Sequence, residues 1–129
     1  MSQAMYSSLD SAVAIALLLK RSARVRSRDW PYVRDISRLL FDLRQRGFRF
    51  RDLGLRRIPD GYYSEDVETF VGQLLSMGYA TQRSPIRLEP KGEQLCDQIV
   101  KAETQDNKEE FELLERTVDD LLRPLPATS

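Results

Sequence analysis

Residues 64–95 read SEDVETFVGQLLSMGYATQRSPIRLEPKGEQL, and this stretch decides the fold. Ser64 is a good helix N-cap, and the apolar residues after it recur at helical spacing. Gly78 ends that pattern, because glycine adopts the left-handed backbone that closes many helices. Two short extended runs, 79–82 and 86–88, then flank an Arg-Ser-Pro turn and predict a β-hairpin, and Pro90 suits the first turn of another helix. The stretch therefore predicts a helix over Ser64–Met77, a hairpin and a helix from Pro90 to about Glu103.

Two further helices are predicted before this stretch. The first covers Ser8–Arg21, with Ser8 as its N-cap, and the second covers Pro31–Arg46. Phe48–Arg51 alternates as an edge strand does, and residues 52–60 have room for a short extra helix before the turn signal Asp60-Gly61. We therefore expect a mainly α domain over residues 1–103, a winged helix-turn-helix with a short β-hairpin as its wing.

A last helix is predicted over residues 108–122. Its apolar residues step by three and four positions, the spacing that suits a partner helix: Phe111, Leu114, Val118 and Leu121. Two heptads are too few to hold a coiled coil alone, so this stripe either folds back on the domain or packs on a second copy. Residues 104–129 are thus predicted as an added C-terminal helix with a disordered tail. A homodimer through the stripe is one expectation.

The composition excludes several kinds of chemistry. The chain has no histidine and one cysteine, Cys96, so His-dependent catalysis and zinc sites built from His or Cys are excluded. No glycine-rich phosphate-binding motif occurs, and the acidic pairs near residues 109 and 119 lie on a solvated helix. We therefore expect no enzyme, metal, cofactor or small-molecule substrate. No apolar run approaches eighteen residues, and the longest is followed by basic residues, so we expect a cytoplasmic protein without a membrane segment.

Charge divides the chain into two halves. Residues 1–63 hold 13 Lys/Arg and 6 Asp/Glu, a net +7, whereas residues 64–129 hold 7 and 14, a net −7. Three interpretations follow. The helix faces differ in sign by chance, the basic half binds an acidic partner or nucleic acid, or the halves pair within the chain or across a dimer.

The helix that reads DNA in a winged helix is acidic here. No Lys or Arg occurs from Ser64 through Gln82, and three carboxylates at its start oppose phosphate contacts. The leading hypothesis is therefore a protein-interaction module, an adaptor or regulatory subunit, that docks an acidic partner through its arginines. The alternative is a DNA-binding transcriptional regulator. Either partner is expected to contact Arg24, Arg26, Arg28, Arg34, Arg38, Arg44, Arg83 and Arg87, and Tyr62 or Tyr63 is a further possible interface anchor.

Three short strings resemble a known family. They are Gly61-Tyr62-Tyr63-Ser64, Leu74-Leu75-x-x-Gly78-Tyr79 and Leu88-Glu89-Pro90-Lys91-Gly92. Panacea-type antitoxin domains and their short bacterial and archaeal relatives carry a similar turn, helix end and helix restart. The resemblance spans roughly residues 9–100, with Tyr62 in place of a turn proline and Pro90 shifting the restart. It implies a winged-helix fold and an antitoxin or adaptor role.

Overall fold

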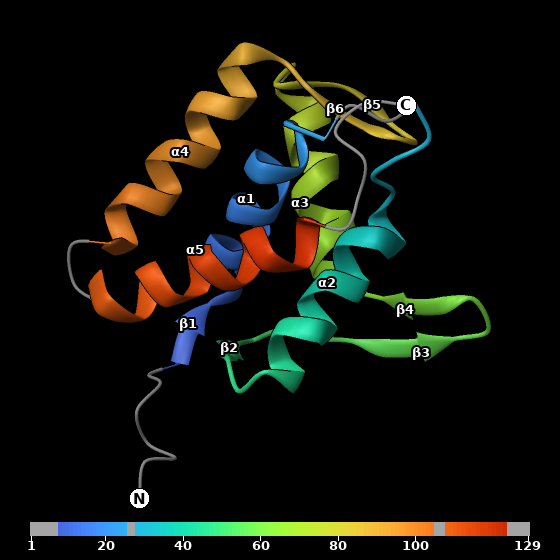
Figure 1. The fold of residues 1–129 in the computed structure, drawn as a ribbon. Coiled ribbons are helices and arrows are strands. Elements are labelled where there is room, and N and C mark those ends of the chain that lie inside the picture. Colours follow the sequence, from blue (N-terminus) through green and yellow to red (C-terminus); the bar gives the residue numbers. More distant parts are fainter. Residues whose placement is uncertain (1–7, 26–27, 105–107, 124–129) are drawn as a thin grey trace, which may run out of the picture.

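The computed structural model describes residues 8–25, 28–104 and 108–123, which form a mainly α fold (Figure 1). The helices are α1 (Ser11–Ser22), α2 (Val33–Gln45), α3 (Glu65–Ser76), α4 (Pro90–Thr104) and α5 (Lys108–Leu122). The strands are β1 (Ser8–Asp10), β2 (Arg49–Arg51), β3 (Arg56–Ile58), β4 (Gly61–Tyr63), β5 (Ala80–Arg83) and β6 (Ile86–Leu88). The prediction of a mainly α chain is confirmed, whereas the predicted disordered tail after residue 123 lies outside the described residues.

Helix α1 is the centre of the core and is buried on almost every side. It contacts each of the other helices, and α4 most extensively (Figure 1). Ser8 was expected as its N-cap, but this prediction is wrong. Residues 8–10 are extended as β1, which pairs in parallel with β2, so Asp10 caps the helix instead and accepts from the Ala12 amide at 2.9 Å.

Helix α2 begins at Val33, two residues after the predicted start. Asp35 accepts a hydrogen bond from the Tyr32 amide at 2.8 Å, which satisfies a backbone donor at the helix start. One side of the helix, including Ile36, Leu40 and Leu43, is fully buried. Its opposite side carries charged residues, so α2 is an amphipathic surface helix.

Residues 52–60 form no helix, which corrects the prediction of a short extra one there. Arg56–Ile58 and Gly61–Tyr63 instead pair as the antiparallel hairpin β3–β4, with Gly61 in the left-handed half of backbone space at φ +139°. The base of the hairpin is fixed on α2, because the Ser64 amide donates to Ser37 Oγ at 3.0 Å. The hairpin then projects beyond the helices (Figure 1). The hairpin lies between α2 and α3 in the chain, whereas the two helices of a helix-turn-helix are joined by a short turn.

The predicted helix, hairpin and helix that follow are all present. Ser64 caps α3 by accepting from the Asp66 and Val67 amides at 3.2 and 3.4 Å. The β5–β6 hairpin packs back on the connection between α1 and α2, where the Ile86 amide donates to the Pro31 carbonyl at 2.7 Å. Gly92 is required near the start of α4, because a Cβ there would lie 2.1 Å from the Tyr79 carbonyl oxygen.

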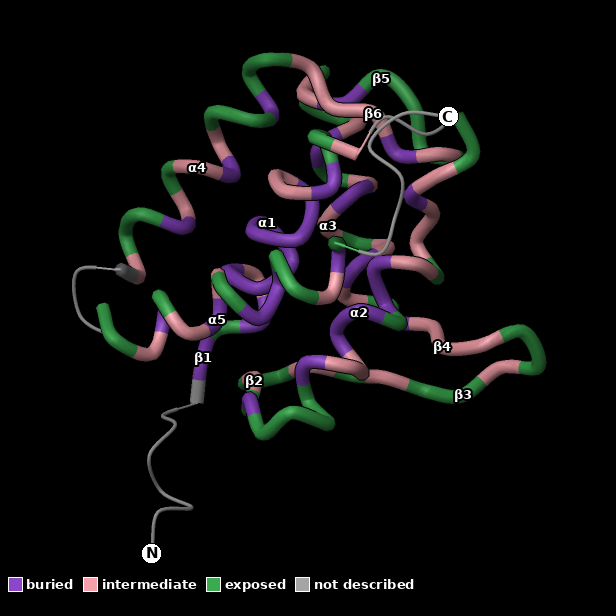
Figure 2. The backbone as a smooth tube through the Cα atoms, in the orientation of Figure 1, coloured by how far each residue is buried: buried purple, intermediate pink, exposed green. Residues whose placement is uncertain are grey.

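Helix α5 folds back on the domain, the first of the two arrangements predicted for it. Along α5, buried stretches alternate with exposed ones (Figure 2). Phe111, Leu114 and Val118 are buried in the same core as α1, while Leu121 is half-buried. These side chains therefore serve the chain's own core in the structure, whereas the homodimer stays a prediction. None of the described helices is long and apolar enough to cross a lipid bilayer.

Ion pairs add to the packing of the two C-terminal helices on α1. Arg21 on α1 binds Glu115 at 2.7 Å and also binds Asp119, both on α5. Lys20 on α1 binds Asp97 on α4, and Asp97 also pairs with Lys101 at 3.0 Å. The two lysines hold the pKa of Asp97 below its usual value. Part of the opposite charge of the two halves is thus paired within the chain.

A candidate arginine–tyrosine binding face

The outer side of α2 and the adjoining β3–β4 hairpin bring arginine and aromatic side chains together. We call this set the arginine–tyrosine face, and it comprises Tyr32, Arg34, Arg38, Phe41, Arg57 and Tyr62. Three of these residues come from the exposed side of α2 at helical spacing. The others come from the residue before α2 and from the hairpin, which is held against α2.

The centre of this face is a stack of aromatic rings. The rings of Phe41 and Tyr62 lie 4.0 Å apart between centroids, with an interplanar angle of 13°. The guanidinium carbon of Arg38 lies 5.9 Å from the Tyr62 ring centroid, within the range of a cation–π contact. Arg57 is paired opposite Tyr62 in the hairpin and so lies on the same side of the strands. Half-buried rings therefore hold exposed cations at the surface.

A second cation–π contact lies at the start of α2. The guanidinium carbon of Arg34 is 5.5 Å from the Tyr32 ring centroid, and the Arg34 side chain is exposed. Arg34 and Arg38 are four residues apart and thus one helical turn from each other. Arg44 is exposed on the last turn of the same helix. The helix therefore offers several guanidinium groups along its length.

Few carboxylates neutralise these arginines. Residues 33–63 contain eight Arg and four Asp, a net charge of +4. Asp35 accepts from the backbone at the start of α2, and Asp42 accepts from Arg38 Nε at 3.2 Å. Since Arg38 uses one edge of its guanidinium for Asp42, its terminal nitrogens remain on an exposed side chain. This region is therefore suited to hold carboxylate or phosphate groups.

The other predicted contact arginines do not join this face. Arg24 and Arg28 are exposed in the connection between α1 and α2, and Arg26 lies outside the described residues. Arg83 pairs with Glu68 on α3 at 2.6 Å. Arg87 donates to the carbonyls of Trp30 and Ile86, both at 3.0 Å, and to that of Arg28 at 3.2 Å. In the structure Arg83 and Arg87 thus make contacts within the chain that help to hold the β5–β6 hairpin, and their contact with a partner stays a prediction.

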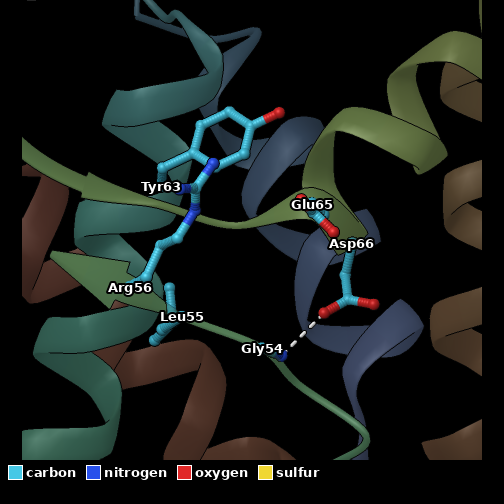
Figure 3. Close-up of a pocket in the computed structure, with 6 residues that line it drawn as sticks. All are labelled: Gly54, Leu55, Arg56, Tyr63, Glu65 and Asp66. Carbon is cyan, nitrogen blue, oxygen red and sulfur yellow. Dashed lines mark hydrogen bonds between the residues drawn. The ribbon is translucent and has the colours of Figure 1, made fainter. Parts of the chain in front are cut away.

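The opposite side of the β3–β4 hairpin borders a hollow at the start of α3 (Figure 3). The hollow has a volume of ≈ 280 Å³ and is lined by Gly54, Leu55, Arg56, Tyr63, Glu65 and Asp66. The guanidinium carbon of Arg56 lies 5.0 Å from the Tyr63 ring centroid. Burial, and then the charges of Glu68 and Glu65, raise the pKa of the Tyr63 phenol, so it stays neutral at physiological pH.

Sequence reasoning missed Phe41 as a site residue and did not find the hollow. Part of the signal for the hairpin was present, because the turn dipeptide Asp60-Gly61 is preceded by Ile58 and followed by Tyr62-Tyr63, whereas the arginines before Ile58 gave no apolar alternation. In the described part of the chain, no group of three or more His, Cys, Asp or Glu residues is placed to hold a metal ion. Burial raises the pKa of Cys96 to about 11, which makes this thiol a poor nucleophile.

Comparison of the chain with protein-family models, with curated proteins and with solved structures found no match.

Proposed function

We propose that this protein is a non-catalytic interaction module, an adaptor or regulatory subunit, that docks an acidic protein partner through the arginine–tyrosine face. In this proposal the fold is a variant winged helix, in which β5–β6 is the wing and the β3–β4 hairpin is inserted between α2 and α3. The inserted hairpin supplies two of the six residues of the docking face, Arg57 and Tyr62.

The proposal is carried by the alternation of exposed guanidinium groups with half-buried aromatic rings across α2 and the hairpin. Tyrosine and arginine are enriched among the residues that dominate protein interfaces. A ring beneath a guanidinium restricts the motion of the arginine, so less conformational entropy is lost when a carboxylate binds. Arg34 and Arg38 carry this argument most directly, because both side chains are exposed and both lie over tyrosine rings.

A DNA-binding regulator is the second candidate. It is favoured by the net charge of +4 over residues 33–63, which arises entirely from arginine. It is disfavoured at α3, because Glu65, Asp66 and Glu68 occupy the first turn of the helix that would enter the major groove. Nucleic acid would therefore have to bind across α2 and the hairpin rather than through α3.

The test compares two charge-reversed variants of the full chain. One replaces the three arginines of the face, Arg34, Arg38 and Arg57, with Glu. The control replaces Arg116 on α5 and Arg123 directly after it with Glu; both are also exposed but distant in sequence from the face. Fluorescence anisotropy measures binding to a labelled Glu-rich peptide and to a labelled random DNA duplex, at low and at physiological salt. Circular dichroism confirms that both variants are folded.

We expect the parent chain and the control to bind the peptide, and the triple variant to bind at least about tenfold more weakly, since three attractive contacts become repulsive. Equal peptide binding by the parent chain and the triple variant refutes the arginine–tyrosine face. Tight duplex binding with a steep salt dependence, lost in the triple variant, moves the DNA-binding alternative ahead.

A further inference from the structure

We propose that the hollow between the β3–β4 hairpin and α3 is an anchor pocket for a planar aromatic group that carries an N–H or O–H donor, such as a tryptophan side chain of the partner. This inference deepens the proposed function, because it adds an apolar anchor to a face that otherwise recognises charge. The hollow is distinct from the arginine–tyrosine face but shares the hairpin with it.

The walls of the hollow differ in chemistry. Tyr63 and Arg56 lie on one side, with Leu55 beside them, and Glu65 and Asp66 lie across from them (Figure 3). Leu55 and Tyr63 are half-buried and provide apolar surface, whereas Arg56 and Glu65 are exposed at the rim. An apolar interior with a few convergent polar groups is typical of a pocket that binds a side chain or a small molecule.

The polar groups define the class of ligand. Asp66 is occupied by the chain itself, since it accepts from the Gly54 amide at 2.7 Å. Across the described residues, the Glu65 carboxylate lines the hollow and has no hydrogen-bond or ion-pair partner, so it is free to accept from an indole N–H or a phenol O–H. The exposed guanidinium of Arg56 already contacts one aromatic ring, Tyr63, and guanidinium groups stack readily on aromatic rings. A planar aromatic donor therefore matches both sides of the hollow.

The position of the hollow links it to the docking face. Adjacent residues of a strand point to opposite sides, so Tyr62 faces α2 while Tyr63 borders the hollow. A partner segment that crosses the hairpin can thus contact the arginines of α2 and place one side chain in the hollow. Interfaces commonly combine such a buried aromatic anchor with a charged rim.

Gly54 allows the hollow to be filled without strain. A Cβ at this position would meet only Asp66 Oδ2, at 3.5 Å, an ordinary van der Waals distance. Its backbone also lies outside the left-handed region, and the residue is exposed. Gly54→Leu is therefore designed to occupy the hollow, and Thr69→Leu, on the exposed side of α3, is the matched control for added apolar surface.

The experiment uses two Glu-rich peptides that differ at one central position, Trp in one and Ala in the other. We expect the full chain to bind the Trp peptide about tenfold more tightly than the Ala peptide, as for a side chain at the centre of an interface. Gly54→Leu is expected to abolish this difference while leaving the affinity for the Ala peptide unchanged. Thr69→Leu is expected to keep the difference.

Equal affinity of the parent chain for both peptides, or a difference that survives Gly54→Leu, overturns the anchor pocket and leaves the proposed function intact. Failure of both peptides to bind counts against the proposed function, and the pocket is then judged by nuclear magnetic resonance with N-acetyltryptophanamide as the probe. The pocket is supported if the probe shifts the amide signals of residues 54 and 55 in the parent chain and does not shift them in Gly54→Leu. Unchanged amide signals overturn it.

Discussion

Replacing Leu114 with Ala tests whether α5 belongs to the core of this chain or to an interface with a second copy. The Leu114 side chain is 0% exposed within the single chain. The substitution removes three carbon atoms, about 2.4 kcal/mol of transfer free energy at about 0.8 kcal/mol each, and leaves a cavity that raises the total cost to about 3 kcal/mol. We expect this loss in the free energy of unfolding, measured by urea denaturation followed by circular dichroism.

The control is Leu121→Ala on the same helix. Leu121 is half-buried, so its truncation is expected to cost about 1 kcal/mol. Each variant is unfolded at two protein concentrations tenfold apart, because the stability of an obligate dimer depends on concentration and that of a monomer does not. A cost for Leu114→Ala no larger than that of the control, or a midpoint that rises with concentration, would refute the assignment of α5 to the chain's own core.

Three further predictions concern individual side chains. Arg21→Ala is expected to lower the free energy of unfolding by about 1–2 kcal/mol in urea denaturation, because it leaves two half-exposed carboxylates of α5 without their cation. Asp97→Asn is expected to cost about 1 kcal/mol at pH 7. The pKa of Asp97 is lowered in the folded state, so its stabilisation is complete above the unfolded value of about 3.9 and is lost as the pH falls through the folded value. The difference in melting temperature between the parent chain and Asp97→Asn, measured at a series of pH values from 7 to 2, should therefore shrink toward the acidic end. A difference that stays constant would contradict this. Cys96, with its pKa of about 11 and no exposed surface, is expected to react with iodoacetamide at pH 8 at least about a hundredfold more slowly in the native chain than in denaturant, as followed by mass spectrometry.

The helices were predictable because their signals are local. Ser64 and Gly78 mark the ends of α3 within a few residues, and the apolar spacing of α5 gave both its extent and its buried side. The β3–β4 hairpin was not predicted, because its strands contain two arginines and two tyrosines rather than an apolar alternation. It is held by contacts distant in sequence, such as the stack of Phe41 and Tyr62.

The candidate site was predictable in composition but not in arrangement. The arginines of α2 were expected to contact a partner and do lie on an exposed side of the fold. Arg87 has the same chemistry, yet it is committed to backbone carbonyls 57 and 59 positions earlier in the chain. Nothing local in the sequence separates an arginine that holds the fold together from one that faces solvent. The distinction depends on which carbonyls the tertiary structure leaves without donors.

The burial of α1 has a consequence for the synthesis of the chain. This helix has almost no solvent-facing side, and its most extensive contact is with α4. Because α1 ends at Ser22 and α4 begins at Pro90, the ribosome must add about 70 residues between them, which takes several seconds at about 5–20 residues per second. During that interval the apolar helix α1 is already made, but α4, against which it packs most extensively, is not. Chaperones that hold apolar segments during translation are therefore expected to act on this chain before α4 is made.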